Sequence, residues 1–220
     1  GDGLDLSGDF LFAVNILGPG GNDLPGGGRV GDATFTAEAS TPGFSITAQN
    51  EIVEWANTEF GDSENDNALE QVMNSIRWSS VPAPVDVQLS GLTAGQAYQL
   101  QLMFFEQCCT RGFDVLVDGV TIVEEYSPQR EHGGIANSGM GAYISHRFTA
   151  AGTSLSISLA GADADWPDRN PILNGLTLET LGAGADAPPV SAGAGAASCA
   201  DINAAGIFTI SPRDGTPAFT

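Results

Sequence analysis

Basic residues are scarce in this sequence, which has seven Lys and Arg against 27 Asp and Glu and a formal net charge of −20. A field of that sign repels phosphate backbones and anionic lipid, so nucleic acid and membrane surfaces are excluded as partners. It attracts cations instead, and a basic partner or Ca²⁺ is the expected bound species. The alternative is that the acidic surface only keeps an extracellular protein soluble.

Long apolar runs are also absent, because no stretch approaches the roughly 18–20 residues that cross a membrane. Charged residues make up only 15% of a chain rich in Gly, Ser, Thr and Ala, a composition typical of secreted β-proteins. The sequence begins with Gly1, which indicates a mature or excised segment. Cysteine is limited to three residues, so any internal pairing leaves one over. These features predict an extracellular or cell-surface protein.

The most informative stretch is residues 98–128. Apolar and polar residues alternate through 98–104 and again through 113–117, the period of a strand with one buried face. Asp118-Gly119 follows, a dipeptide that favours a two-residue hairpin turn when apolar alternation lies on both sides. Three strands are therefore predicted here, with Cys108-Cys109 between the first two.

Further strands are predicted where short apolar or alternating runs lie between turn signals: residues 10–17, 29–37, 44–48, 85–89, 142–149, 155–159 and 172–181. The first of these is apolar except for Asn15 and is predicted to be fully buried. One short helix is predicted from Asn67, which can cap it together with Glu70, to Arg77-Trp78. Residues 129–141 are predicted as a long loop. Strands at this spacing indicate an all-β sandwich or jelly roll with one short helix.

The chain divides near residue 182. Residues 183–198 are Gly, Ala, Pro and Ser with no core-forming pattern, and they are predicted as a linker. Residues 1–182 form one predicted domain. Residues 199–220 are the start of a second module or an extended tail.

Several local motifs resemble those of the malectin and malectin-like domains, in the same order, over roughly residues 10–181. They are Ala13-Val14-Asn15 before a Gly-rich loop, Arg29-Val30-Gly31, Tyr98-x-Leu-x-Leu-x-Phe-x-Glu106, Phe113-Asp114-Val115-x-Val117-x-Gly119 and Asp168-x-Asn170-Pro171-x-x-Asn174-Gly175-Leu176. The resemblance implies a jelly-roll sandwich of the galactose-binding-like type that binds carbohydrate through loops at one end.

The same resemblance implies a site. Asp168 falls on the ligand-binding aspartate of the family, and Trp166 stands where an aromatic residue commonly precedes it. Cys108-Cys109 replaces the aromatic pair that follows the Phe-x-Glu motif in malectin. An indole that stacks on a sugar ring, beside Asp168 and Arg169 as hydrogen-bonding groups, would make a carbohydrate site. In the alternative interpretation, Trp166 only holds its loop on the sandwich and Asp168 pairs with Arg169.

Tyr126 and Tyr143 lie at the two ends of the predicted loop 129–141, which we expect near this site. Both tyrosines are therefore included among the candidate carbohydrate-binding residues.

The tail carries a second resemblance. The phrase Ser198-Cys199-x-Asp201-Ile202 resembles the start of a fibrinogen-like C-terminal domain. That resemblance implies a longer multidomain protein, in which the partner of Cys199 lies beyond Thr220.

The pairing of Cys108-Cys109 has three possible forms. The two can form a vicinal disulfide that gives the site a rigid apolar surface, or one of them can pair with Cys199. Both can also remain buried thiols, which are common for unpaired cysteine. An extracellular composition favours a disulfide.

Two acidic clusters are candidate Ca²⁺ sites because they offer several carboxylates at short spacing. One is Asp2, Asp5 and Asp9, and the other is Asp62, Glu64 and Asp66. Acidic clusters of this kind are also commonly only solvated. Ca²⁺ is the one cofactor that the sequence suggests.

Catalysis finds little support. The two histidines, His132 and His146, have no metal-ligand spacing, and neighbouring acids such as Glu124-Glu125 point to opposite faces of a strand. We therefore expect a non-catalytic extracellular module for carbohydrate recognition or adhesion, with a glycan or glycoprotein as its partner. The alternative is a structural subunit of a filament or coat, in which copies assemble through sandwich and tail contacts.

Overall fold

The computed structural model describes residues 4–134, 138–161, 166–182 and 206–210. Its longer strands are β1 (Asp9–Asn15), β5 (Phe44–Thr47), β8 (Val85–Ser90), β9 (Ala97–Phe104), β10 (Phe113–Val117), β11 (Val120–Tyr126), β12 (Gly141–Thr149), β13 (Ser154–Gly161), β15 (Gly175–Thr180) and β16 (Gly206–Ile210). Its short strands are β2 (Arg29–Val30), β3 (Ala33–Thr34), β4 (Thr36–Ala37), β6 (Asn50–Ile52), β7 (Ile76–Trp78) and β14 (Ile172–Leu173). The helices are α1 (Glu64–Val72) and α2 (Pro128–Glu131), with 3-10 turns at Gly21–Asp23, Pro25–Gly28 and Glu38–Ser40.

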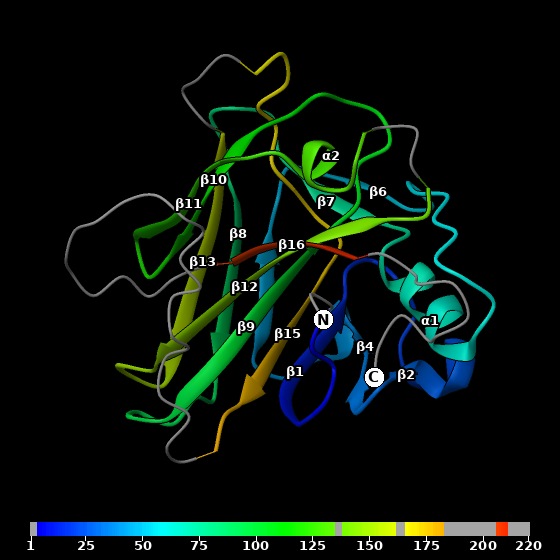
Figure 1. Ribbon diagram of the computed structural model, residues 1–220. Helices are drawn as coiled ribbons and strands as arrows, with labels where there is room; N and C mark the ends of the chain where they lie inside the picture. Colours follow the sequence, from blue (N-terminus) through cyan, green and yellow to red (C-terminus); the bar gives the residue numbers. More distant parts are fainter. Residues whose placement is uncertain (1–3, 135–137, 162–165, 183–205, 211–220) are drawn as a thin grey trace, which may run out of the picture.

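Two sheets make the sandwich (Figure 1). A six-stranded sheet has the order β16-β12-β9-β15-β1-β4, and a five-stranded sheet has the order β11-β10-β13-β8-β5. Smaller sheets, β14-β7-β6 and β2-β3, complete the fold. The prediction of an all-β sandwich is confirmed. Within the described residues there is no helix of the length and apolar character that a membrane crossing needs.

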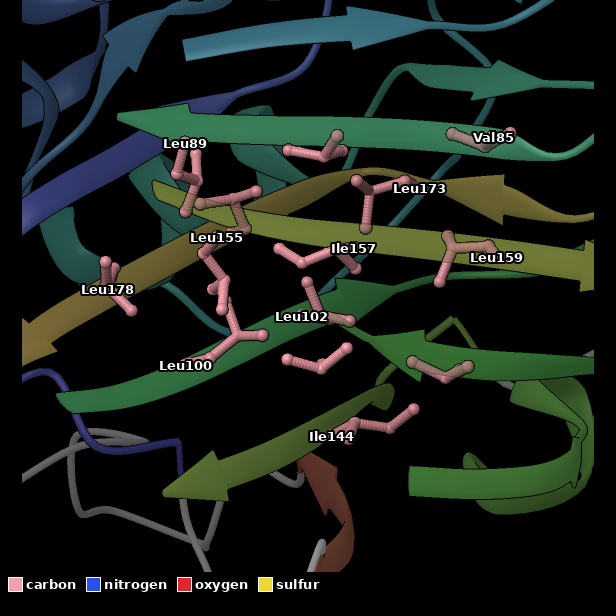
Figure 2. Packing of buried hydrophobic residues seen from close by; sticks show 14 of the residues in the cluster. Val85, Leu89, Leu100, Leu102, Ile144, Leu155, Ile157, Leu159, Leu173 and Leu178 are labelled. Carbon is pink, nitrogen blue, oxygen red and sulfur yellow. The ribbon is translucent and has the colours of Figure 1, made fainter. Parts of the chain in front are cut away.

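Alternating side chains of the two large sheets fill the core between them (Figure 2). Eight of them are at most 1% exposed: Val85, Val87 and Leu89 of β8, Leu100 and Leu102 of β9, and Leu155, Ile157 and Leu159 of β13. Complete burial of one such aliphatic residue contributes about 1.5–3 kcal/mol. The alternation in the sequence therefore predicted the inward face of these strands correctly.

Strand β9 is buried on both faces, which corrects the expectation of one buried face. Gln99, Gln101 and Met103, on the side away from the main core, are almost fully inaccessible. The amide of Gln101 accepts a hydrogen bond from the backbone N–H of Asp5 at 2.9 Å and donates one to Thr177 Oγ1 at 3.0 Å. The N-terminal segment thus covers this face, and the polar side chains are tolerated there because their hydrogen bonds are made.

The predicted hairpin is confirmed. Val117 pairs with Val120, and Asp118 and Gly119 form the two-residue turn, with φ of 48° and 78°. Two positive φ angles are what this turn type needs, and glycine adopts them without a steric penalty. The Asp118 carboxylate also accepts the backbone N–H of Ser156 on β13 at 2.9 Å, so the turn is fixed to the neighbouring strand.

The N-cap of helix α1 lies four residues before the predicted cap Asn67, and the helix ends at Val72, before Arg77-Trp78, so both ends of that prediction were wrong. The N-cap is Ser63, whose hydroxyl accepts the N–H of Asp66 while the Asp66 carboxylate accepts the N–H of Ser63. This reciprocal capping box provides hydrogen-bond acceptors for backbone N–H groups that have no partner within the first turn of a helix. Asn67 therefore lies inside the helix.

Three other local predictions need correction. Strand β1 is not fully buried: a register shift between Phe10 and Phe12 leaves Leu11 40% exposed. Residues 29–37 form three short strands instead of one, because Gly31 turns the chain at a φ of 61°. Residues 129–141 are not a continuous loop, since α2 begins at Pro128, a residue preorganised for the first helical turn. The described part of the chain therefore has two short α-helices instead of one.

The C-terminal strand β16 pairs antiparallel with β12 at the edge of the six-stranded sheet. Residues 183–205 and 211–220, which include Cys199 and most of the fibrinogen-like segment, lie outside the described residues. The division at residue 182 stays a prediction.

Candidate functional site

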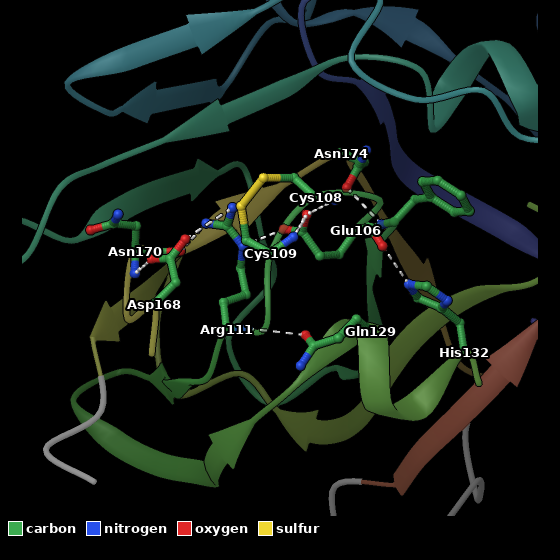
Figure 3. A network of polar contacts seen from close by, with 10 residues as sticks. Glu106, Cys108, Cys109, Arg111, Gln129, His132, Asp168, Asn170 and Asn174 are labelled. Carbon is green, nitrogen blue, oxygen red and sulfur yellow. Dashed lines mark hydrogen bonds and ion pairs between the residues drawn. A yellow bond between two sulfur atoms is a disulfide. The ribbon is translucent and has the colours of Figure 1, made fainter. Parts of the chain in front are cut away.

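The candidate site lies where loop 105–112, between β9 and β10, meets segment 166–171, which precedes β14. Arg111 and Asp168 form a parallel backbone bridge, and the N–H of Gly112 donates to the Asp168 carbonyl at 3.0 Å. The N–H of Asp168 donates in turn to the Thr110 carbonyl at 3.2 Å. The two segments are thereby fixed to each other, and α2 packs beside them through Gln129 and His132 (Figure 3).

Glu106 is the centre of this site, and its side chain is completely buried. One carboxylate oxygen, Oε1, accepts the backbone N–H groups of Cys108 at 2.6 Å and Cys109 at 2.9 Å. The other, Oε2, forms an ion pair with Nε of Arg111. Burial raises the pKa of Glu106 above its ordinary value, while Arg111 and the two amides oppose that shift.

Arg111 connects the segments of the site. Its guanidinium, 5% exposed, also lies 3.4 Å from Asp168 Oδ2 and donates to the Asn170 carbonyl at 2.5 Å. Its backbone N–H donates to Gln129 Oε1 at 3.3 Å. A buried guanidinium between two carboxylates is compensated, whereas removal of any one partner leaves an unpaired buried charge.

His132 holds α2 against this network. Its Nε2 lies 2.9 Å from the Glu106 carbonyl oxygen, and its ring stacks on Phe105 with the centroids 5.2 Å apart. Since a carbonyl only accepts, Nε2 carries the proton of the imidazole. Burial lowers the pKa of His132. His132 is therefore a neutral imidazole that donates a hydrogen bond to the Glu106 carbonyl. This structural contact accounts for its position.

Cys108 and Cys109 are joined by a disulfide, the first of the three predicted forms. Cys108 is exposed and Cys109 half-buried, so the disulfide lies at the surface above Glu106 (Figure 3). Glu106, Cys108 and Cys109 are also the one group of three potential metal ligands found among the described residues. The group does not fit a metal ion, because the sulfurs are bonded to each other and both oxygens of Glu106 face donors or a cation.

The two predicted Ca²⁺ clusters are not brought together as metal sites in the described chain. The Asp66 carboxylate is used in the helix cap, and that of Asp5 accepts the hydroxyl of Ser7 at 2.7 Å. Asp2 lies outside the described residues. Among the described residues, the carboxylates of Asp9, Asp62 and Glu64 do not gather with two other potential ligands closely enough to hold one ion. Ca²⁺ binding stays an untested prediction.

Trp166 lies half-buried between Gly112 and Arg130. The indole packs so closely on Gly112 that a Cβ at that position would overlap it. The Arg130 guanidinium lies 5.5 Å from the centroid of the indole, within range of a cation–π contact, and its side chain is 60% exposed. Trp166 thus both holds its loop on the sandwich and reaches the surface.

Asp168 pairs with Arg111 and not with Arg169, which corrects the alternative interpretation. Its Oδ1 accepts the N–H of Asn170 at 2.8 Å, and its side chain keeps 20% of its surface exposed. Arg169 is half-buried in the same segment.

Tyr126 and Tyr143 are not surface residues, and their inclusion in the site was wrong. Tyr126 is fully buried, with its ring 4.8 Å from Phe104 and 5.8 Å from Phe113. Tyr143 is 3% exposed and packs in a second core cluster with Phe105. Tyr126 faces the core between the two sheets and Tyr143 faces the second cluster on the other side of the six-stranded sheet, so neither side chain is exposed to a ligand.

Sequence reasoning missed Arg111, Gln129 and Arg130. Glu106 stood in a quoted motif but received no role. A signal existed, since two carboxylates at the site need a cation and Arg111 is the nearest basic residue to Glu106 in the sequence.

Comparison with known proteins identifies the fold. No family model matches the sequence, and no curated protein does. The extracellular domain of ANXUR2 from Arabidopsis thaliana superimposes with a TM-score of 0.62 at 16% identity, over 78% of this chain and 48% of that one. Plant FER, in complex with the peptide RALF23 and LLG2, gives 0.56 at 10% identity, over 80% and 41%. The fold is malectin-like.

A third solved structure, a calcium-binding mutant of Bacteroides uniformis β-glucuronidase 2, has a TM-score of 0.53 at 15% identity, over 77% of this chain and 18% of that one. This chain spans about half the length, or less, of the solved proteins that it resembles. At these identities the likeness establishes the malectin-like fold alone.

Proposed function

We propose that this chain is a non-catalytic extracellular recognition module that binds carbohydrate on the surface formed by Trp166, Arg130 and the Cys108–Cys109 disulfide. One observation carries the proposal: an indole with a guanidinium 5.5 Å from its centroid, and an apolar disulfide, reach the surface from segments that the ion pairs of Arg111 join. The extracellular domain of ANXUR2, which shares the fold, supports an extracellular setting, and FER in complex with RALF23 and LLG2 supports a protein partner such as a glycoprotein.

Each group has a separate part in the proposed binding. The exposed part of the Trp166 indole packs on the C–H face of a pyranose ring, as aromatic side chains do in sugar sites. Arg130 donates to ring hydroxyls, and the exposed oxygen of Asp168 accepts from them. The net charge of −20 favours a neutral or basic sugar over an acidic one.

The arrangement gives no support to hydrolysis. Both carboxylates of the site, Glu106 and Asp168, face the same guanidinium, and Glu106 has no contact with solvent. A glycosidase needs two carboxyl groups that reach the substrate, one of them as a proton donor. Recognition without turnover is the function that fits this geometry.

A glycan array with the full chain, followed by calorimetry on any hit, tests the proposal. We expect Trp166→Ala to abolish binding and Trp166→Phe to retain part of it, since phenylalanine keeps a stacking face. Trp78→Phe, a matched change at another half-buried tryptophan, is expected to bind like the wild type. Absence of binding to any glycan, or equal binding by Trp166→Ala, contradicts the proposal; binding to a peptide instead would change the ligand class.

A second candidate is a structural subunit of an extracellular assembly. The observation that favours it is the placement of β16 on the edge of the six-stranded sheet, far in sequence from the strand that it extends.

A further inference from the structure

The outer edge of β12 is the feature that carries a further inference. β12 pairs with β9 from Ala142 to Thr149 on its inner side, and with β16 from Gly141 to Ser145 on its outer side. The sheet is therefore already continuous without β16, which adds one strand to an existing edge (Figure 1). An open edge offers unpaired N–H and C=O groups, and a strand of the same or another chain can pair with them.

The connection to β16 is long compared with the distance that it must cross. β15 ends at Thr180, and three strand spacings, about 14 Å, separate it from β16 across the sheet. Residues 181–205 connect the two, and a chain of that length reaches about 80 Å when extended. A connection with so much excess length allows β16 to reach the edge of its own sheet or that of a neighbouring molecule.

Charge favours this pairing over other contacts between copies. The chain has 27 acidic residues, so most of its surface repels a second copy. Residues 206–210, Gly-Ile-Phe-Thr-Ile, have no charge, and β12 contains no Asp or Glu. Two copies can therefore approach each other where β16 of one meets β12 of the other, because neither strand carries a carboxylate.

We propose that β16 is an exchangeable strand and that the outer edge of β12 is its acceptor site in a second copy of this chain. At low concentration the strand pairs within its own molecule, because the connection holds it there at an effective concentration in the millimolar range. At high concentration it pairs with β12 of a neighbour, which gives closed dimers or open chains of copies. Higher salt promotes the exchange, since it screens the repulsion between acidic surfaces.

The experiment uses the full chain in a Cys199→Ser background, so that no intermolecular disulfide contributes. The sequence has no lysine, so amine-reactive dyes attach at the α-amino group of Gly1. Donor-labelled and acceptor-labelled samples are mixed across a concentration series at low and high salt. Energy transfer reports strand exchange, and light scattering after size-exclusion chromatography reports mass.

We expect energy transfer and mass to rise with concentration and with salt. In the double variant Ile207→Pro and Phe208→Pro, two adjacent residues of β16 lose their backbone N–H groups. Successive N–H groups of a strand point to opposite sides, so one of the two removed groups is the one that faces β12. The double variant should weaken association by at least about tenfold, because one of the two N–H groups faces β12 and two prolines in a five-residue strand prevent its pairing with the acceptor of either copy. The matched variant Ile202→Pro and Asn203→Pro changes no residue of the described pairing, 206–210, and should behave like the parent.

The proposal is overturned if the parent chain stays monomeric without energy transfer at every concentration and salt. It is equally overturned if the Ile207→Pro and Phe208→Pro variant associates as strongly as the parent. Neither result depends on a glycan, so the outcome is separate from the carbohydrate test.

Discussion

The buried ion pair of Glu106 and Arg111 gives the sharpest test of how the site is held. Replacement of Arg111 by Met removes the cation and leaves the Glu106 carboxylate unpaired, although its side chain is completely buried. Loss of one partner of a buried pair costs about 3–5 kcal/mol. We therefore expect Arg111→Met to lower the free energy of unfolding by that amount near neutral pH, measured by urea denaturation with an unchanged m-value.

Two further variants isolate the cause. In the double variant Glu106→Gln and Arg111→Met, the amide oxygen at position 106 still accepts the N–H groups of Cys108 and Cys109, and no buried charge is left at that position. Asp168 also loses Arg111, but its side chain is 20% exposed and keeps the N–H of Asn170. Part of the lost stability should return. Arg29→Met, at an exposed pair with Asp32 whose side chains are 64% and 52% exposed, should cost less than about 1 kcal/mol.

The same reasoning predicts a pH dependence. Burial raises the pKa of Glu106 above its ordinary value of 4.5, and Arg111 opposes that shift. Without Arg111 the folded-state pKa rises further, so the cost is absent below pH 4.5, where the carboxyl is protonated in both states, and grows as the pH increases. A loss below about 1 kcal/mol near neutral pH, or an equal loss at about pH 4, would refute the reasoning.

Two other predictions follow from single contacts. Burial and the nearby Asp5 raise the pKa of Glu179 to about 7, so stability that is full below pH 4.5 is lost as the pH rises towards 7. Glu179→Gln should remove this dependence in thermal melts, and unchanged pH profiles would contradict it. Gly112→Ala should cost about 1–3 kcal/mol because its Cβ overlaps Trp166, whereas Gly152→Ala, with open space around it, should be nearly neutral in the same urea assay.

The local pattern of the sequence was most reliable where one physical cause dominates. Alternation predicted β8, β10 and β13 because burial of one face decides their register. Asp118-Gly119 predicted its hairpin because few residues adopt two successive positive φ angles. The start of α1 was wrong because Ser63 and Asn67 are both acceptable caps, and the sequence alone does not rank them.

The candidate site was predicted only in part, for a related reason. The sequence indicated Trp166, Asp168 and the cysteine pair, but it placed Tyr126 and Tyr143 beside them because both flank a polar segment. Which side chains of a strand are covered depends on the elements that pack on it. Both tyrosines are buried, Tyr126 between the two sheets and Tyr143 in the second core cluster.

The sequence by itself determined the strand-rich composition, the inward face of most core strands, the hairpin turn and the acidic surface, since these depend on residues close together in the chain. Only the tertiary structure decided that Arg111 compensates both Glu106 and Asp168, and that β16 pairs with β12. The contact of Arg111 with Asp168 and the pairing of β16 with β12 join residues far apart in the chain. Many pairings of that kind satisfy the same local pattern, and the packing of the whole sandwich selects among them.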